Sequence, residues 1–476
     1  MNKKRLPKST YPNRYEIELD VDLDNFSYTG AQKVDLNVVE ATNNIVLNSV
    51  GIEVTKAKIQ TTKQDIPLEV NYIEEDEKIV FESQETLSEG VYELYLEFNS
   101  EITNDLKGFY KSSYMSEDGE KKWIATTQFE PTAARSAFPC WDEPEYKAIF
   151  SMTIITDEKY LRVSNEMVVE EEKVENNKLR TKFADSMKMS SYLVAFVIGD
   201  LEATVVGKSK TTDIRIIHRP GFSHQTSYAG TAAIKLLDFF EDYYKIPYPG
   251  TKLDLIAIPD FAMGAMENVG AVTFRENLLL FDKDKATRSE LDRSITVIAH
   301  ELAHMWFGDL VTMKWWDGIW LNEAFASLME VIASYNTYPE FKQWNAMNMS
   351  RTAGFSIDSL ENSRPVEFDV ETPDQAEEMF DVLTYEKGST VLRMFQMFIG
   401  EEAFQNGVEA YLNKFKFENT NSSDLWDALS EASNQPLNKI LPFWIREKGY
   451  PFLPVSYTHL RAHETRHDLV CRLLLE

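Results

Sequence analysis

The stretch from residue 300 to residue 323 contains the side chains best suited to chemistry in this chain. His300 and His304 are four positions apart, so on a helix their imidazoles project from one face. Eighteen residues lie between His304 and Glu323, which opens a second apolar, helix-like stretch. Two neutral imidazoles and a carboxylate fill three tetrahedral positions of a zinc ion and leave the fourth for water. The spacing predicts one Zn²⁺ per chain, held by His300, His304 and Glu323.

Glu301 follows the first of these histidines directly. It is placed to take the proton from a zinc-activated water as that water attacks a carbonyl. The competing interpretation is a pair of satisfied histidines on a buried helix. Because a second carboxylate also stands at the required distance, at Glu323, the metal site is favoured over coincidence.

A second motif indicates which bond is cut. Gly264-Ala265-Met266-Glu267-Asn268 follows an extended apolar run at residues 253–258 and by itself could be an ordinary turn. Together with the zinc motif it resembles the GxMEN exopeptidase signature of the zinc aminopeptidase N family. Three further segments match the family in order: Thr127-Gln128-Phe129-Glu130, Phe138-Pro139-Cys140-Trp141-Asp142-Glu143-Pro144 and Tyr385-Glu386-Lys387-Gly388. The resemblance covers about residues 12 to 452.

The resemblance implies how a substrate would be recognised. A peptide's free α-amino group is a cation at neutral pH. Glu267, assisted by Glu130, would bind this group and block deeper entry, so that a single residue lies beyond the zinc. The expected activity is removal of the N-terminal residue from peptides with a free N-terminus. Met263, Met266 and Phe129 hint at the pocket for that residue without fixing its preference.

The resemblance also assigns the remaining motif residues. The backbone at Gly264 and Ala265 would lie along the substrate as an added strand, and Met266 and Asn268 belong to the same substrate-binding segment. Tyr385 matches the tyrosine that donates a hydrogen bond to the oxyanion formed during the reaction.

Three alternative functions remain open at this point. An endopeptidase would use the same zinc chemistry, although Glu267 would then obstruct an extended substrate. A lipid-epoxide hydrolase activity is known in a relative of the family, and no residue here selects it. A non-catalytic scaffold should lack a ligand, the base or the tyrosine, and this chain lacks none of them.

The hydrophobic pattern divides the chain into two regions. Residues 1–203 alternate apolar and polar side chains, as at residues 15–23, which predicts half-buried strands. Residues 204–452 change from short apolar strands to long helical stretches. We expect an N-terminal all-β, saddle-like sandwich domain followed by a thermolysin-like α/β, mainly helical catalytic domain. We also expect the family's C-terminal β and helical domains to be missing from this sequence.

The zinc-binding helix should begin near Ser289. Ser289 with Asp292 three residues later resembles a capping box. The apolar residues that follow recur at spacings of three and four, giving one stripe nearly opposite the histidines: Leu291, Ile295, Ile298, Leu302 and Met305. This helix should therefore be buried.

Composition limits the partners and the location. The net charge of −28 argues against nucleic acid or an anionic membrane surface as partner. The basic Met1–Lys8 segment leads into polar sequence, so we expect no signal peptide, and no apolar run reaches membrane-spanning length. The two cysteines, Cys140 and Cys471, indicate a reducing compartment. We therefore expect a cytoplasmic monomer.

The last residues depart from this pattern. Residues 455–476 contain three of the seven histidines. Read codon by codon, the segment matches a widely used transposon-end sequencing adapter and the sequence that follows it. We therefore expect residues 455–476 to be a non-native translated tail, with the natural coding sequence cut at about Leu453 or Pro454.

Overall fold

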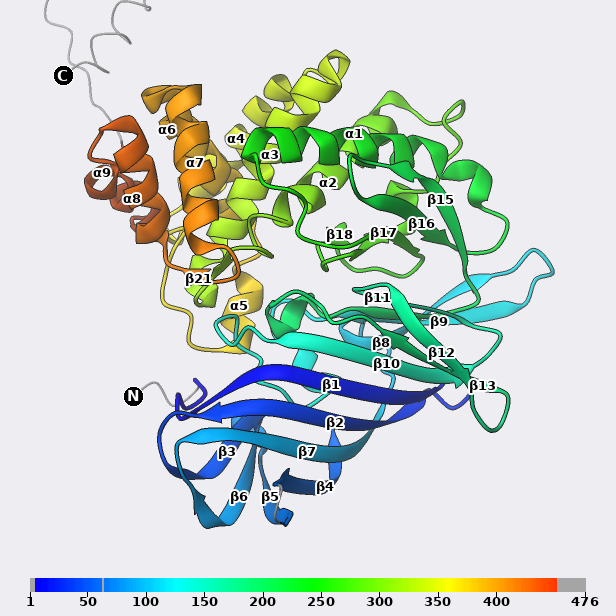
Figure 1. Cartoon of the computed structure of the whole chain (residues 1–476). Coiled ribbons are helices and arrows are strands. Elements are labelled where there is room, and N and C mark those ends of the chain that lie inside the picture. Colours follow the sequence, from blue (N-terminus) through cyan, green and yellow to red (C-terminus); the bar gives the residue numbers. More distant parts are fainter. Residues whose placement is uncertain (1–4, 62–63, 452–476) are drawn as a thin grey trace, which may run out of the picture.

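Two domains stacked one above the other make up the chain (Figure 1). The computed structural model describes residues 5–61 and 64–451. An all-β N-terminal domain lies below, and a mainly helical domain built around a five-stranded sheet lies above it (Figure 1). The predicted order of an all-β domain and an α/β, mainly helical domain is confirmed. The predicted adapter at residues 455–476 lies outside the described residues.

The N-terminal domain contains a ten-stranded and a four-stranded sheet. The larger sheet has the strand order β12-β13-β10-β1-β2-β7-β4-β5-β6-β3, and its parallel neighbours are β1 and β10. Its strands are β1 Thr10–Asp22, β2 Ser27–Val38, β3 Thr42–Asn48, β4 Glu53–Gln60, β5 Ile66–Ile73, β6 Lys78–Leu87, β7 Gly90–Glu101, β10 Ile149–Asp157, β12 Val168–Lys173 and β13 Lys178–Phe183. The smaller sheet has the order β11-β14-β9-β8, with β8 Gly108–Met115, β9 Lys121–Gln128, β11 Leu161–Ser164 and β14 Phe196–Gly199.

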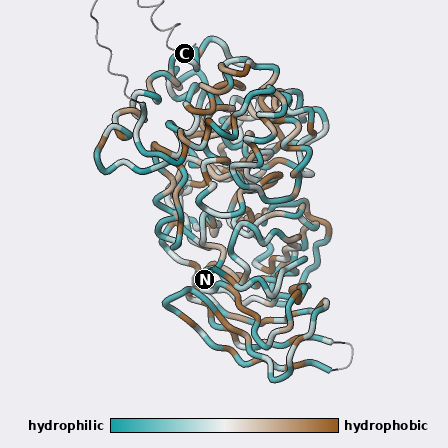
Figure 2. Tube along the Cα trace, turned by 90° about the vertical axis from the view of Figure 1, so that its left-hand side faces the viewer, coloured by the Kyte–Doolittle hydropathy of each residue, from teal (hydrophilic) through white to brown (hydrophobic). Residues whose placement is uncertain are grey.

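Alternating hydrophobicity forms these strands. In β1, Tyr15, Ile17 and Leu19 are buried, whereas the acidic residues between them lie on the outer face. Side chains of successive strand residues point to opposite faces, so this pattern places one face of the sheet on the core. Apolar and polar segments alternate along the strands of this domain (Figure 2).

The second domain is built on a mixed sheet. Its strand order is β15-β16-β17-β19-β18, with β15 Glu202–Lys208, β16 Asp213–His218, β17 Leu253–Ile258, β18 Ala265–Met266 and β19 Ala271–Arg275. Strands β16, β17 and β19 are parallel, and the edge strands β15 and β18 are antiparallel to them. Strand β17 coincides with the predicted apolar run and is buried throughout, as expected for a central strand covered on both faces. Because β14 ends at Gly199 and β15 begins at Glu202, we propose that the domain boundary lies at residues 200–201, close to the predicted border at residue 203.

Helix α1 (Ser227–Tyr244) packs against β15, β16 and α2 (Arg288–His304), and α2 packs against α3 (Trp320–Thr337). The α2 helix starts slightly earlier than predicted. Its N-cap is Thr287, which exchanges hydrogen bonds with Glu290 in a capping box. Both Thr287 with Glu290 and Ser289 with Asp292 have the required spacing, and the longer side chain of Glu290 is the one that a capping box prefers at this position.

The remaining helices follow α3. They are α4 Gln343–Asp358, α5 Pro373–Glu378, α6 Gly388–Ile399, α7 Glu401–Phe415, α8 Ser422–Ser433 and α9 Leu437–Arg446. A π-helical turn at Leu383–Lys387 leads into α6. The short strands β20 (Thr312–Met313) and β21 (Asn419–Thr420) pair in parallel and tie the helices together. Among residues 5–61 and 64–451, no helix combines the length and apolarity that crossing a membrane requires.

The glycine of the Tyr385-Glu386-Lys387-Gly388 motif allows α6 to contact α3. A Cβ atom at Gly388 would lie 2.5 Å from the Cβ atom of Ala324, far closer than two carbon atoms approach without bonding. The backbone φ of Gly388 is −57°, so the need for glycine here is steric. Ala324 follows Glu323, and the contact therefore sets the distance between Glu323 and the turn that carries Tyr385.

Replacing Gly388 with alanine should force α6 away from α3. We expect Gly388→Ala to lower the free energy of unfolding by about 1–3 kcal/mol, the usual cost of overpacking. Gly354→Ala is the matched control, because Gly354 is also helical but a Cβ atom there would have its nearest neighbours at 3.6 Å. The control should be neutral or stabilising by up to about 1 kcal/mol. Urea unfolding of both variants gives the comparison, and equal stabilities would contradict the steric explanation.

Candidate metal centre and active site

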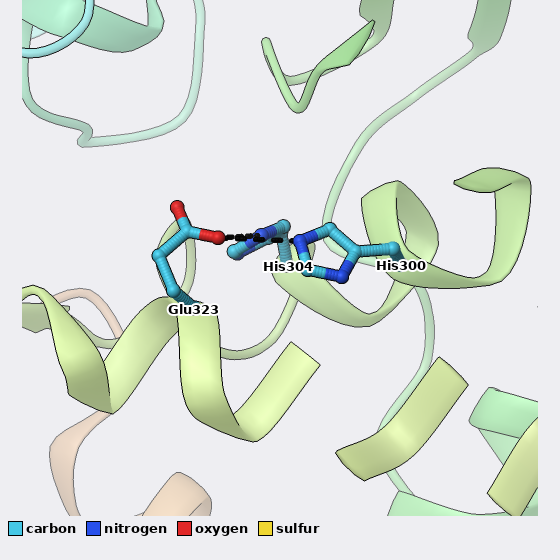
Figure 3. A group of neighbouring side chains, drawn as sticks. All are labelled: His300, His304 and Glu323. Atoms are coloured by element: carbon cyan, nitrogen blue, oxygen red, sulfur yellow. Dashed lines mark hydrogen bonds and ion pairs between the residues drawn. The ribbon is translucent and has the colours of Figure 1, made fainter. Parts of the chain in front are cut away.

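Helices α2 and α3 bring the two histidines and one glutamate together. The Nε2 atom of His300 lies 3.2 Å from Oε2 of Glu323, and the Nε2 atom of His304 lies 3.4 Å from the same oxygen. Figure 3 shows both rings pointing at this carboxylate across the gap between the helices. The i, i+4 spacing places both histidines on one face of α2, as predicted.

The outer nitrogen of each ring faces a hydrogen-bond acceptor. Nδ1 of His300 lies 2.8 Å from Oε2 of Glu330, and Nδ1 of His304 lies 3.0 Å from the carbonyl oxygen of Phe307. A neutral ring carries one proton, and with a cation between the Nε2 atoms and Glu323 the acceptors at Nδ1 would keep that proton on Nδ1. The lone pair of each Nε2 is then directed at the centre, which is the tautomer that a metal ion needs.

These residues fit a zinc ion. One donor atom from each of His300, His304 and Glu323 lies within 4.8 Å of the others, and a set of two imidazoles and one carboxylate is typical of catalytic zinc. Burial lowers the pKa of His304, but the negative charges of Glu267 and Glu323 outweigh this and raise it to about 10. Burial also disfavours ionised Glu323, yet the two histidines hold its pKa below the ordinary value. The centre attracts positive charge.

Glu301 lies beside this centre and is buried. Burial, opposed by the nearby histidines, raises the pKa of Glu301 to about 8. A divalent cation in the centre opposes that rise and favours the ionised carboxylate. Such a group can accept a proton and return it.

Glu130 and Glu267 come from different domains and meet beside Glu323. Glu130 follows β9 of the N-terminal domain, and Glu267 follows β18 of the second domain. One carboxylate oxygen from each lies within 4.8 Å of the other and of one oxygen of Glu323. Burial and the charge of the neighbouring carboxylate raise the pKa of Glu130 well above its ordinary value, and burial raises that of Glu267.

Both glutamates retain unused hydrogen-bonding capacity. The Oε1 atoms of Glu130 and Glu267 are buried and have no hydrogen-bond partner among the described residues. The Nδ1 atom of His304 lies 3.9 Å from Oε1 of Glu267, which is too long for a hydrogen bond. Buried carboxylate oxygens without donors are costly, so this pair can bind a cationic donor such as an ammonium group.

The GxMEN segment borders the site as an edge strand. Ala265 and Met266 form β18, which pairs with β19 at the end of the five-stranded sheet. Gly264 extends this pairing, because its carbonyl oxygen accepts a hydrogen bond from the Arg275 amide. Asn268 is buried behind the strand, where its amide donates to Oγ1 of Thr273. The outer edge of β18 can accept another strand.

Tyr385 lies beside His300 and lines the same cavity as that residue. Its ring stacks on the ring of His300, with 5.9 Å between the centroids and 19° between the planes. Burial, with the charges of Glu323 and Glu130, raises the pKa of Tyr385 well above its ordinary value. The hydroxyl therefore stays protonated at neutral pH and can donate a hydrogen bond.

One cavity of about 360 Å³ joins these groups. The predicted site residues that line it are Glu130, Ala265, Met266, Glu267, His300, Glu301, His304, Glu323 and Tyr385. Gly264 and Asn268 do not line it; they hold the strand that does.

Sequence reasoning missed Glu330 and Gln128. Glu330 lies seven residues after Glu323, two turns along the same face of α3, and this spacing was the available signal. Gln128 lines the cavity, and its amide nitrogen lies 3.3 Å from the sulfur of Met266. Phe129, which seemed to hint at the pocket, is fully buried, because it points away from the face shared by Gln128 and Glu130.

Comparison with protein families agrees with this geometry. The model of the peptidase M1 N-terminal domain matches residues 11–193, and that of the peptidase family M1 domain matches residues 228–444. The chain belongs to the peptidase M1 family. Aminopeptidase M1 of Arabidopsis thaliana is 42% identical over 452 residues, which are 94% of this M1 chain and 51% of the relative.

Two further relatives show the same coverage. Aminopeptidase 2 of Candida albicans is 40% identical over 95% of this chain and 48% of its own length. The puromycin-sensitive aminopeptidase of Caenorhabditis elegans is 39% identical over the same shares of the two chains. The M1 chain thus spans about half the length of the curated relatives it matches.

Zinc affinity should depend on Glu330 as well as on the three ligands. We expect Glu323→Ala to abolish stoichiometric binding, and Glu330→Gln to weaken it by about 10- to 100-fold, because the outer carboxylate orients and polarises His300. Glu386→Gln is the control, since Glu386 is a half-buried neighbour of Glu330 without a hydrogen bond to either histidine. Competition with a chelator of known affinity measures the three dissociation constants. Equal constants for the Glu330 and Glu386 variants would contradict the role of Glu330.

Proposed function

We propose that this chain carries the catalytic centre of a zinc aminopeptidase, which hydrolyses the N-terminal residue from peptides with a free N-terminus. The supporting observation is the position of Glu130 and Glu267. Each of these carboxylates has a buried oxygen without a hydrogen-bond partner among the described residues, and one oxygen of each lies within 4.8 Å of an oxygen of Glu323. A substrate ammonium group would supply the donors that these oxygens lack, and it would bring the first peptide bond next to the metal ligands.

His300, His304 and Glu323 would hold one zinc ion per chain. When bound, zinc would acidify a water molecule and polarise the substrate carbonyl. The outer edge of β18 would pair with the substrate backbone, which allows binding independent of sequence. Glu130 and Glu267 would fix the amino terminus by charge-assisted hydrogen bonds.

Two side chains would then act on the reacting atoms. Glu301 accepts the proton of the attacking water and passes it to the leaving nitrogen. Tyr385 donates a hydrogen bond to the oxygen on which negative charge develops, and its raised pKa keeps that proton in place. Burial of the site strengthens both electrostatic effects.

An endopeptidase is disfavoured by the same two glutamates. An extended substrate would place an uncharged peptide group against Glu130 and Glu267 and leave both carboxylates without a cation. No described residue favours epoxide hydrolysis over peptide hydrolysis. The monomeric state, the cytoplasmic location and the lack of nucleic-acid or membrane partners stay predictions from charge and composition.

Removing the base should separate metal binding from turnover. Glu301→Gln preserves the shape of the side chain but cannot accept a proton, so kcat should fall by about 10²- to 10⁴-fold while one zinc ion remains bound. Elemental analysis and steady-state kinetics on an aminoacyl anilide measure the two quantities. Turnover at the wild-type rate would show that Glu301 is not the base.

The free amino group should decide whether a substrate is cleaved. We expect the zinc-loaded chain to hydrolyse an aminoacyl anilide and to leave its N-acetylated counterpart intact, because acetylation removes the cation that Glu130 and Glu267 bind. Glu267→Gln should raise KM for the free substrate by about 10- to 100-fold, the factor expected for one charge-assisted hydrogen bond. Equal cleavage of both substrates would instead favour an endopeptidase.

A further inference from the structure

The two glutamates proposed to bind the substrate amine belong to different domains, so something must fix their separation. Glu130 follows the end of β9 at Gln128, and Glu267 follows β18. The residues next to these glutamates make a direct contact, in which the amide nitrogen of Gln128 lies 3.3 Å from the sulfur of Met266. A sulfur acceptor forms weak hydrogen bonds and cannot hold two domains in register by itself.

Strand β8 makes a stronger connection. The hydroxyl of Tyr110 donates to the carbonyl oxygen of Asp260 at 3.0 Å, and the Asp260 amide donates to Oγ of Ser112 at 2.9 Å. Tyr110 and Ser112 are two residues apart, on one face of β8, and both are fully buried. The Ser113 amide also donates to the Asp260 carboxylate, at 2.9 Å. Both backbone groups of Asp260 are thus held by the N-terminal domain.

The residues that make these hydrogen bonds are close in the chain or in the sheet to the two glutamates. Strand β8 pairs with β9, where Tyr110 lies opposite Thr126, four residues before Glu130. Asp260 lies in the loop between β17 and β18, and the Arg275 side chain donates to the carbonyl oxygens of Phe261 and Ala262 in that loop. Figure 1 shows β8 and β9 on the side of the N-terminal domain that faces β18. Hydrogen bonds therefore join the strand that precedes Glu130 to the loop that precedes β18 and Glu267.

We propose that Tyr110 and Ser112 are positioning residues, which set the separation of Glu130 and Glu267 and thereby the selectivity for a free α-amine. This inference rests on the proposed function. Neither side chain lines the cavity, so both act through the loop at Asp260. A cation held by two carboxylates gains full stabilisation when both oxygens lie at hydrogen-bond distance. A shift of about 1 Å in one partner weakens that binding steeply and leaves the metal ligands on α2 and α3 in place.

The test compares two inhibitors that differ by the amino group. Leucine hydroxamate and its des-amino counterpart, 4-methylpentanohydroxamate, present the same metal-binding group and the same side chain. The inhibition constant of the des-amino compound divided by that of leucine hydroxamate gives a selectivity ratio, which reports the contribution of the amine. The proteins are the zinc-loaded wild-type chain, Tyr110→Phe, Ser112→Ala, the double variant and Tyr114→Phe. Tyr114 is the matched control, since it lies on β8 and its hydroxyl donates to the carbonyl oxygen of Asp200 at 2.7 Å, away from the loop at Asp260.

We expect each single variant to reduce the ratio about fivefold, the factor corresponding to one lost hydrogen bond, and the double variant to reduce it further. Tyr114→Phe should keep the wild-type ratio, and zinc content should be unchanged throughout. KM for a free aminoacyl anilide should rise more than kcat falls.

The results that would contradict the role of Tyr110 and Ser112 differ from the result that would contradict amine binding. An unchanged ratio in the double variant would overturn the proposal, and so would equal weakening of both inhibitors, which would indicate general damage to the metal centre. If the double variant loses zinc, the two single variants decide the question by the same ratio. A wild-type ratio near one would instead remove the proposed amine binding itself, and with it the basis for this inference.

Discussion

An excess of buried negative charge is the constraint on which the rest of this structure depends. Glu130, Glu267, Glu301 and Glu323 line one cavity with two imidazoles. Burial raises the pKa of Glu130, Glu267 and Glu301, and the histidines hold that of Glu323 low. Like charges out of water are unstable unless cations accompany them. A metal ion on the histidine side and a substrate ammonium on the other would satisfy the whole group.

Both domains contribute to holding this charge in place. The buried amine of Lys147 in the N-terminal domain donates to the carbonyl oxygens of Asp309 and Leu310, at 3.0 and 3.3 Å. The Tyr192 hydroxyl donates to the carbonyl oxygen of Gly308 at 3.2 Å. These bonds fix the loop after α2, whose Phe307 carbonyl oxygen orients His304. The N-terminal domain therefore supports the loop behind the candidate metal centre as well as supplying Glu130.

Much of the fold and of the candidate site could be predicted from the sequence. The alternation at residues 15–23 predicted β1, and the apolar run at residues 253–258 predicted β17. The four-residue spacing of His300 and His304 predicted two histidines on one face of a helix. Boundaries were less certain, since two candidate caps competed at the start of α2. Roles that depend on side-chain direction were also beyond prediction: Phe129 is buried in the core, and Gln128 beside it faces the cavity.

The sequence by itself identified the candidate chemistry: which residues could bind zinc and which carboxylate could act as a base. These follow from residue type and from spacing along one helix or strand, where geometry is periodic. The tertiary structure decided what depends on distances between separate elements. It brought Glu130 and Glu267 within 4.8 Å of each other, placed Glu330 behind His300 and joined β8 to the loop at Asp260. Such contacts depend on how whole domains pack, and no local pattern encodes that packing.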